Sequence, residues 1–166
     1  MAQMMAGESL SARLQAILAQ VRPDLVLVIG DSLLAATQAL AGCRGSITCL
    51  SSSGAAKELS GLEIHDLALV WADAALAETE IAILLSRLRD IYARKVLVIV
   101  PCDLSSGSWN RRSLVRLGFT PYGTAVDEAG EQLFLYQFDI ATYKTTPDWL
   151  SSNNWANPEL WDKYRW

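Results

Sequence analysis

An apolar strand followed by a sharp turn constrains this chain more than any other feature. Five apolar residues, Leu25–Ile29, follow each other without a polar break, and three of them are β-branched. Such a run is typical of a strand buried on both faces. Gly30 permits the exit that a strand-to-helix turn needs, and Asp31 or Ser32 can cap a helix over residues 33–40. Because ligands of open α/β sheets bind at the carboxyl ends of the strands, we expect any functional site near this turn.

Apolar periodicity divides the rest of the chain into alternating helices and strands. Leucine and isoleucine at helical spacing after Ser9 predict a first helix, which ends before Pro23. The clearest helix is predicted over residues 75–94 and the clearest strand over residues 95–100. The other predicted elements are strands over residues 46–50, 62–64, 66–71, 119–126 and 132–140, and helices over residues 55–59 and 109–117.

This alternation indicates an α/β fold with a doubly wound, mostly parallel sheet that carries helices on both faces. The last two strands flank residues 127–131 at a spacing typical of an antiparallel hairpin. A length of 166 residues favours one domain. We expect that domain over residues 1–141 and a compositionally different tail over residues 142–166.

The charge balance argues against several classes of partner. The formal net charge is −4, which does not favour nucleic-acid binding. The cluster Arg111, Arg112 and Arg116 is interpreted as a solvated helix face. No apolar run approaches the ~18 residues of a membrane span. Residues 1–9 lack the basic start and apolar stretch of a signal peptide, so we expect a cytoplasmic protein.

The order of elements resembles that of the class I S-adenosylmethionine-dependent methyltransferases. These share an entry helix, a glycine-containing first strand-turn, alternating strand–helix units and a terminal hairpin. The likeness spans residues 10–140. Residues 66–73 resemble the family's fourth strand, residues 95–101 its fifth, and residues 119–140 its sixth and seventh. The resemblance implies a Rossmann-like fold and S-adenosylmethionine as the cofactor.

The motifs depart from that family at two points. Its first loop carries a Gly-x-Gly signature, whereas this loop has the single glycine Gly30. Its second strand ends in an acidic residue that accepts the ribose hydroxyls, whereas Ser51, Ser52 and Ser53 stand here. Few residues separate Ser52 from the next strand, which leaves little room for a third strand of the family's order. These departures favour a degenerate cofactor site that binds no cofactor and a protein without strong catalytic activity.

A second resemblance rests on four letters. The segment Gly30-Asp31-Ser32-Leu33 is identical to the Gly-Asp-Ser-Leu block of the GDSL (SGNH) esterases and lipases, which implies Ser32 as a nucleophile. A serine nucleophile needs a base, supplied in that family by an Asp-x-x-His motif near the C-terminus. The one histidine, His65, has no such motif after it. Hydrolysis is therefore the third functional interpretation, after a methyltransferase-like protein and an interaction module, and a helix cap is the structural interpretation of Asp31 or Ser32.

The end of the strand over residues 66–71 adds two candidates. Methyltransferases place substrate-contacting residues here, so the resemblance implies that Trp71 and Asp73 face the same crevice as Gly30. From the residues alone, Asp73 also suits an N-cap and Trp71 the core. No catalytic residue and no metal set is indicated. The candidate ligand- or cofactor-binding residues are Gly30, Asp31, Ser32, Ser51, Ser52, Trp71 and Asp73.

The remaining reactive side chains are predicted to be structural. His65 is expected in a loop, at the surface or hydrogen-bonded, because the sequence offers it no catalytic partner. Cys43, Cys49 and Cys102 lack a Cys-x-x-Cys spacing and are expected to be reduced. No base or positive neighbour is evident to activate Cys102.

Tryptophan is concentrated in the tail. Residues 142–166 hold Trp149, Trp155, Trp161 and Trp166, and Asn157-Pro158-Glu159 is a good start for a short terminal helix. Four such rings left in water would form an unusual exposed patch. We therefore expect the tail to dock on its own domain, on a second copy or on a protein partner. A non-catalytic interaction module that uses this tail is the alternative to a methyltransferase-like protein.

Overall fold

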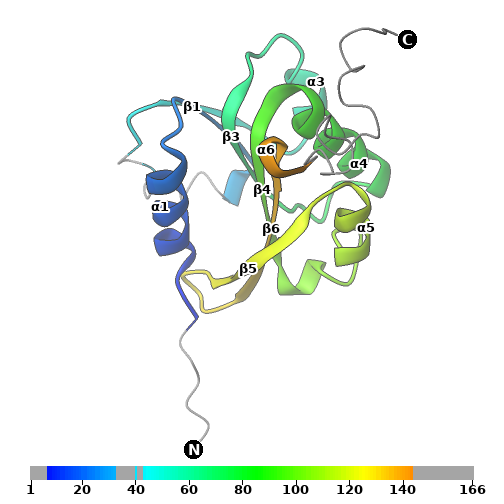
Figure 1. Cartoon of the computed structure of the whole chain (residues 1–166). Coiled ribbons are helices and arrows are strands. Elements are labelled where there is room, and N and C mark those ends of the chain that lie inside the picture. The colour runs from blue at the N-terminus through cyan, green and yellow to red at the C-terminus, as the bar shows by residue number, and fades with distance from the viewer. Residues whose placement is uncertain (1–6, 33–39, 41–42, 144–166) are drawn as a thin grey trace, which may run out of the picture.

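The computed structural model describes residues 7–32, 40 and 43–143. The described strands form a single mixed sheet in the order β2-β1-β3-β4-β6-β5. Figure 1 shows this sheet with its helices. The strands β1 to β4 are parallel to one another, and β6 runs antiparallel to both of its neighbours. The strands are β1 (Leu25–Ile29), β2 (Ser46–Leu50), β3 (His65–Trp71), β4 (Ala93–Pro101), β5 (Thr120–Val126) and β6 (Gln132–Asp139). The helices are α1 (Leu10–Val21), α3 (Ala55–Glu58), α4 (Glu78–Arg87), the π-helix η2 (Leu88–Tyr92), the 3₁₀-helix η3 (Cys102–Leu104), α5 (Arg111–Arg116) and α6 (Ile140–Tyr143).

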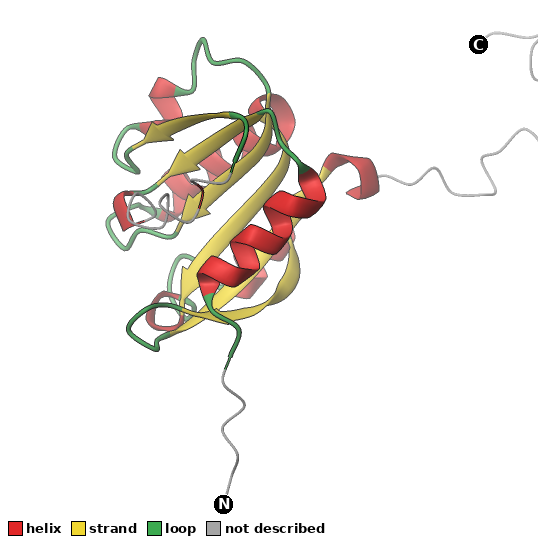
Figure 2. Cartoon of the chain, turned by 90° about the vertical axis from the view of Figure 1, so that its left-hand side faces the viewer, coloured by secondary structure: helices red, strands yellow, loops and turns green. Residues whose placement is uncertain are grey.

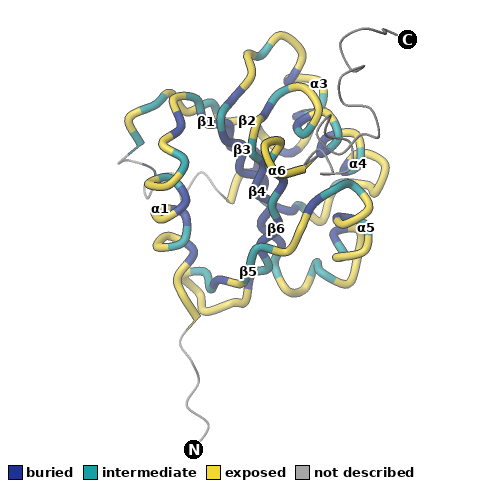
Figure 3. The backbone as a smooth tube through the Cα atoms, viewed as in Figure 1, coloured by how far each residue is buried: buried dark blue, intermediate teal, exposed yellow. Residues whose placement is uncertain are grey.

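Helices cover both faces of the sheet, as the alternation predicts. The helix α1 lies across one face, which Figure 2 presents to the viewer. The helices α3, α4 and α5 pack on the other face against a separate apolar cluster. The central strands are therefore buried on both sides, and the tube in Figure 3 is darkest along them. This explains why the sequences of β1, β3 and β4 contain continuous apolar runs.

The first helix follows its sequence signals. Ser9 caps α1 by accepting a hydrogen bond from the Ala12 amide at 3.2 Å. Arg22 ends the helix in the left-handed conformation, with φ of 47°. Leu10, Leu14 and Ile17 form the buried stripe of the helix. The apolar spacing therefore predicted both the helix and its buried face.

The terminal hairpin is also confirmed. The strands β5 and β6 pair antiparallel, with a register shift between Pro121 and Gly123 that marks a β-bulge. The strand β6 ends at Asp139, and Ile140 begins α6 instead of extending the strand.

Several predicted boundaries are corrected. The helix predicted over residues 75–94 begins at Glu78 and continues as a π-helix to Tyr92, so β4 begins at Ala93. The helix predicted over residues 109–117 begins at Arg111 after an Asn110 cap, whose side chain accepts from the Ser113 amide at 2.9 Å. Caps and tertiary packing decide where an element ends, and apolar periodicity alone does not predict these positions.

The short strand predicted over residues 62–64 does not form. Leu62 closes a turn onto the Leu59 carbonyl at 3.1 Å, and the chain enters β3 directly. A parallel crossover needs about a dozen residues or more, and α3 already occupies part of residues 51–64. In the part of the chain that the structure describes, β2 is therefore the last strand at its edge.

Two predictions fall outside the described residues. They are the helix over residues 33–41, of which only residue 40 is described, and the tail beyond Tyr143. Within the described ranges, no helix is long and apolar enough to cross a bilayer.

Candidate functional site

The carboxyl ends of β1, β2 and β3 bring together four of the residues predicted from the sequence. Ile29 is paired with both Leu50 and Val70, so the three strands end at the same level. Gly30 donates its amide to the Leu50 carbonyl at 3.1 Å. Ser52, Trp71 and Asp73 follow the neighbouring strand ends, which defines the candidate site.

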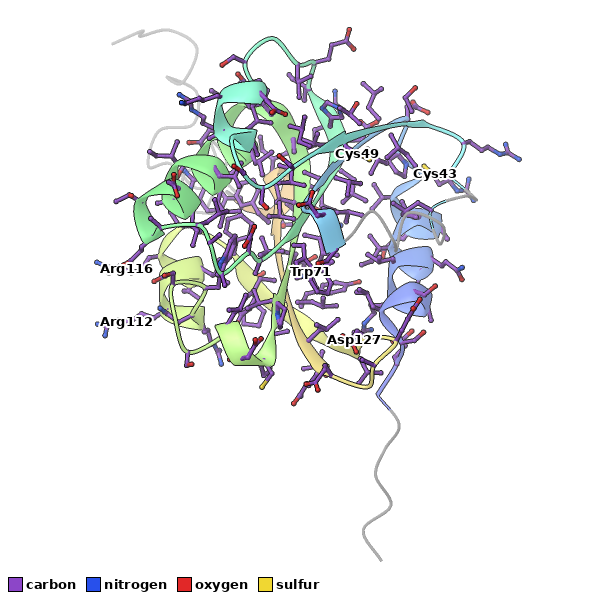
Figure 4. All side chains as sticks on the ribbon, turned by 180° about the vertical axis from the view of Figure 1, so that it is seen from behind. Cys43, Cys49, Trp71, Arg112, Arg116 and Asp127 are labelled. Carbon is purple, nitrogen blue, oxygen red and sulfur yellow. The ribbon has the colours of Figure 1, made fainter. Side chains whose placement is uncertain are left out.

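Gly30 is required here by packing. It has φ of +118°, a conformation that L side chains rarely adopt. A Cβ added to it would lie 2.8 Å from the Cβ of Trp71. The glycine therefore lets the backbone of β1 pass close to β3 as the strand ends. Trp71 itself is partly buried against the cluster on the α1 face, and Figure 4 shows it beside the strands.

A hydrogen bond joins Ser52 to Asp73 across the ends of β2 and β3. The Ser52 hydroxyl donates to Asp73 Oδ2 at 2.5 Å, and Ser52 is only 5% exposed. The other carboxylate oxygen, Oδ1, accepts from the Ala75 amide at 2.9 Å. Both oxygens of Asp73 are therefore engaged by the protein. We call this pair the Ser52–Asp73 clasp.

The clasp changes the acidity of Asp73. The Ser52 hydroxyl and, to a lesser extent, the Ala75 amide stabilise the carboxylate, which lowers the pKa of Asp73 below its ordinary value of 3.8. Partial burial acts in the opposite direction and is the smaller effect. Asp73 is thus a fixed anion whose hydrogen-bonding capacity is partly used inside the fold.

Trp109 is hydrogen-bonded to the backbone of Asp73, a role that the sequence did not predict. Its indole Nε1 donates to the Asp73 carbonyl at 2.9 Å, and its side chain is 1% exposed. It precedes the Asn110 cap of α5 by one residue, and Leu114 of the same helix is buried in the same cluster. An apolar residue just before an N-cap commonly packs on the first turns of the helix. Recognising Asn110 as the cap would have identified Trp109 as a core residue.

The other predicted site residues are at the surface. Asp31 and Ser32 are exposed and are already helical directly after Gly30, so the prediction that one of them caps the helix from outside is wrong. Ser51 is also exposed, and its hydroxyl donates to the Ser53 carbonyl at 3.0 Å. No described carboxylate stands in the place after β2 where the methyltransferase resemblance implies one.

His65 lies at the opposite end of β3, so its predicted loop position is wrong. It is the first residue of the strand, is 3% exposed, and its Nδ1 is 2.8 Å from the Glu63 carbonyl oxygen. Val70, the partner of Ile29, lies five positions further along β3, or about 16 Å away along the strand. The imidazole therefore lies at the amino-terminal end of β3, whereas Ser32 follows the carboxyl end of the neighbouring strand β1.

The three cysteines are not paired with one another. Cys43, Cys49 and Cys102 are free thiols, the first partly buried and the others exposed. No group of three or more potential metal ligands occurs among the residues that the structure describes.

Solved structures with a similar fold include methyltransferases. The N-methyltransferase NodS of Bradyrhizobium japonicum WM9 is 16% identical over 77% of this chain and 92% of its own, with a TM-score of 0.57. An rRNA methylase of Escherichia coli is 17% identical over 78% and 63%, with a TM-score of 0.50. A Haemonchus contortus N-methyltransferase, solved with S-adenosylhomocysteine, is 11% identical over 81% and 39%, with a TM-score of 0.51. At these identities the likeness establishes a methyltransferase-like α/β fold.

Sequence comparison places the chain in a family that has no assigned activity. A search of curated proteins by sequence found no match. The model of one family matches residues 8–166, which include both the α/β domain and the tryptophan-rich tail. The chain therefore belongs to the family of unknown function DUF6231.

Proposed function

We propose that this chain is a methyltransferase-like protein without methyl-transfer activity, which acts by binding a ligand or a partner. The Ser52–Asp73 clasp carries the proposal. Ser52 follows β2, where the methyltransferase resemblance implies a free carboxylate that accepts the ribose hydroxyls of S-adenosylmethionine, whereas the carboxylate of the clasp, Asp73, follows β3 and is bonded to Ser52. A carboxylate gives strong charge-assisted hydrogen bonds to such hydroxyls.

The residues around the clasp support this interpretation. Ser51 offers only a neutral hydroxyl that already bonds to Ser53, while both oxygens of Asp73 accept bonds from the protein. The glycine of the first loop is accounted for by its approach to Trp71. In the described chain, no strand lies beyond β2 to extend a pocket for the adenine.

The hydrolase interpretation has less support. A serine hydrolase needs a base within hydrogen-bond reach of its nucleophile. The chain has one histidine, and it lies at the end of the parallel strands opposite to Ser32. We therefore interpret the Gly-Asp-Ser-Leu match as a coincidence of four letters.

Calorimetric titration of the full chain with S-adenosylmethionine and with S-adenosylhomocysteine tests the proposal. We expect no binding at sub-millimolar concentrations of either compound. Ser51→Asp is the matched variant, because it places a carboxylate at an exposed position directly after β2. A gain of binding in that variant would show that the missing acid is what prevents binding.

The same titration can also contradict the proposal. Micromolar binding of S-adenosylmethionine to the unmodified chain would contradict the proposal and favour an active methyltransferase. Ser52→Ala would then locate the site, because loss of the clasp would change the affinity only if the cofactor lies against Asp73.

A further inference from the structure

A hollow of about 380 Å³ lies beside the terminal hairpin, on the face of the sheet that carries α5. One side is formed by β5 and β6, and the other by Ser105 and Arg111, which follow β4. It shares no residue with the candidate site at the ends of β1 to β3. Its lining residues are Ser105, Arg111, Pro121, Gly123, Thr124, Phe134, Leu135 and Tyr136.

The hairpin register explains the apolar wall of this hollow. Pro121 is paired with Tyr136, and Thr124 with Phe134, so these four side chains project from the same face. Tyr136 and Phe134 pack on the cluster beneath α4 and α5. The bulge between Pro121 and Gly123 changes the direction of β5 here. Tyr136 is only 5% exposed, so the accessible part of this wall is formed by the partly buried Phe134 with Pro121 and Thr124.

Two polar side chains at the hollow, those of Arg111 and Thr124, have no partner among the described residues. Arg111 makes no ion pair and no side-chain hydrogen bond with any described residue, and the same holds for the Thr124 hydroxyl. Ser105, by contrast, donates to the Cys102 carbonyl at 2.6 Å. Among the lining residues Arg111 carries the one full charge at neutral pH. The hollow therefore combines an apolar wall that includes Phe134 with an unpaired guanidinium and a free hydroxyl.

We propose that this hollow binds a small aromatic carboxylate of one or two rings. The flat body of such a ligand would lie against Phe134 and Pro121, and its carboxylate would accept hydrogen bonds from Arg111. A guanidinium binds a carboxylate with two parallel hydrogen bonds. Sites for small ligands typically measure about 300–1,000 Å³ and combine apolar walls with a few polar groups. The volume lies near the lower end of this range, which favours a ligand of one or two rings.

The test uses 2-naphthoate and its neutral analogue 2-naphthamide with the full-length chain. Calorimetry measures affinity, and ¹H–¹⁵N chemical shifts locate the contact. We expect 2-naphthoate to bind in the micromolar to millimolar range and to shift the amides of Gly123, Thr124 and Leu135. Arg111→Gln should weaken binding roughly tenfold, because a charged hydrogen-bond donor is lost. Arg112→Gln is the control, since Arg112 is exposed and points away from the body in Figure 4.

Several outcomes would overturn the proposal. These are no binding of 2-naphthoate at millimolar concentration, equal binding of 2-naphthamide, and equal weakening by Arg112→Gln. Shifts confined to the ends of β1 to β3 would also overturn it, because the ligand would then occupy the other site. The result does not depend on S-adenosylmethionine binding, since the two sites share no residue.

Discussion

At the scale of single residues, the clasp makes stability depend on pH. The pKa of Asp73 is lowered in the folded chain, so the ionised carboxylate favours the folded state. This contribution is complete above the ordinary value of 3.8, which applies to the unfolded chain. It is lost as the pH falls below 3.8 and through the lower folded value.

Ser52→Ala should therefore destabilise the protein in a pH-dependent way. The variant loses the hydroxyl that contributes most to the lowered pKa of Asp73. We expect a lower melting temperature than that of the unmodified chain at about pH 6, and a smaller difference below pH 3.8. Thermal melts followed by circular dichroism over this range measure the effect. Ser51→Ala, at an exposed position, is the control, and a pH-independent difference would show that Ser52 acts through packing alone.

Residues of the site were predicted with uneven success, for physical reasons. Gly30 was identifiable because a glycine directly after a buried strand indicates a turn. The approach of Trp71 that also requires this glycine involves a contact between β1 and β3, which local sequence does not encode. The clasp likewise joins residues 52 and 73. Both were candidates individually, but their hydrogen bond depends on the strand order.

At the scale of elements, one arginine ties the π-helix η2 to the C-terminal part of the domain. Arg89 donates from Nη1 to the Leu117 carbonyl at 2.6 Å and forms an ion pair with Asp90. Its guanidinium also lies 5.9 Å from the ring centre of Phe138 and 5.8 Å from that of Tyr143. Arg89 thus links η2 with β6, α6 and the end of α5.

Arg89→Met should test this connection. The change keeps a long side chain but leaves the Leu117 carbonyl without its charged donor. We expect a loss of about 1–3 kcal/mol in the free energy of unfolding, measured by urea denaturation. Arg94→Met is the matched control, because Arg94 is exposed at the start of β4. An equal loss in both variants would contradict a linking role for Arg89.

Elements were predicted better than their ends. Periodicity identified α1, β1, β2, β3, β4 and the hairpin, because burial on one or two faces imposes a repeat on the sequence. It did not predict the π-helix, whose residues fit the same apolar stripe as α4. It also suggested a strand over residues 62–64, which the short connection between β2 and β3 does not allow.

At the scale of the whole molecule, the fold class followed from the alternation of elements and was confirmed by the sheet order.

The position of the tail could not be predicted from this alternation. The family match extends through residue 166, so the tail belongs to the unit that the family shares. It follows α6, where Tyr143 lies 5.0 Å from Phe138, ring centre to ring centre. The tail therefore begins at a point that is attached to the domain.

We propose that the tail docks on its own domain, and deletion of residues 145–166 tests this. Each of its tryptophans can bury about 150–250 Å², and attachment at α6 gives the tail a high effective concentration at the domain. Deletion should lower the melting temperature and increase the binding of an apolar dye. A full-length variant with Trp149, Trp155, Trp161 and Trp166 replaced by serine should reproduce the drop, because it removes the rings but keeps the chain. If both variants melt unchanged and protease removes the tail from the intact monomer, docking on its own domain is wrong. The tail would then be the segment with which to search for a partner.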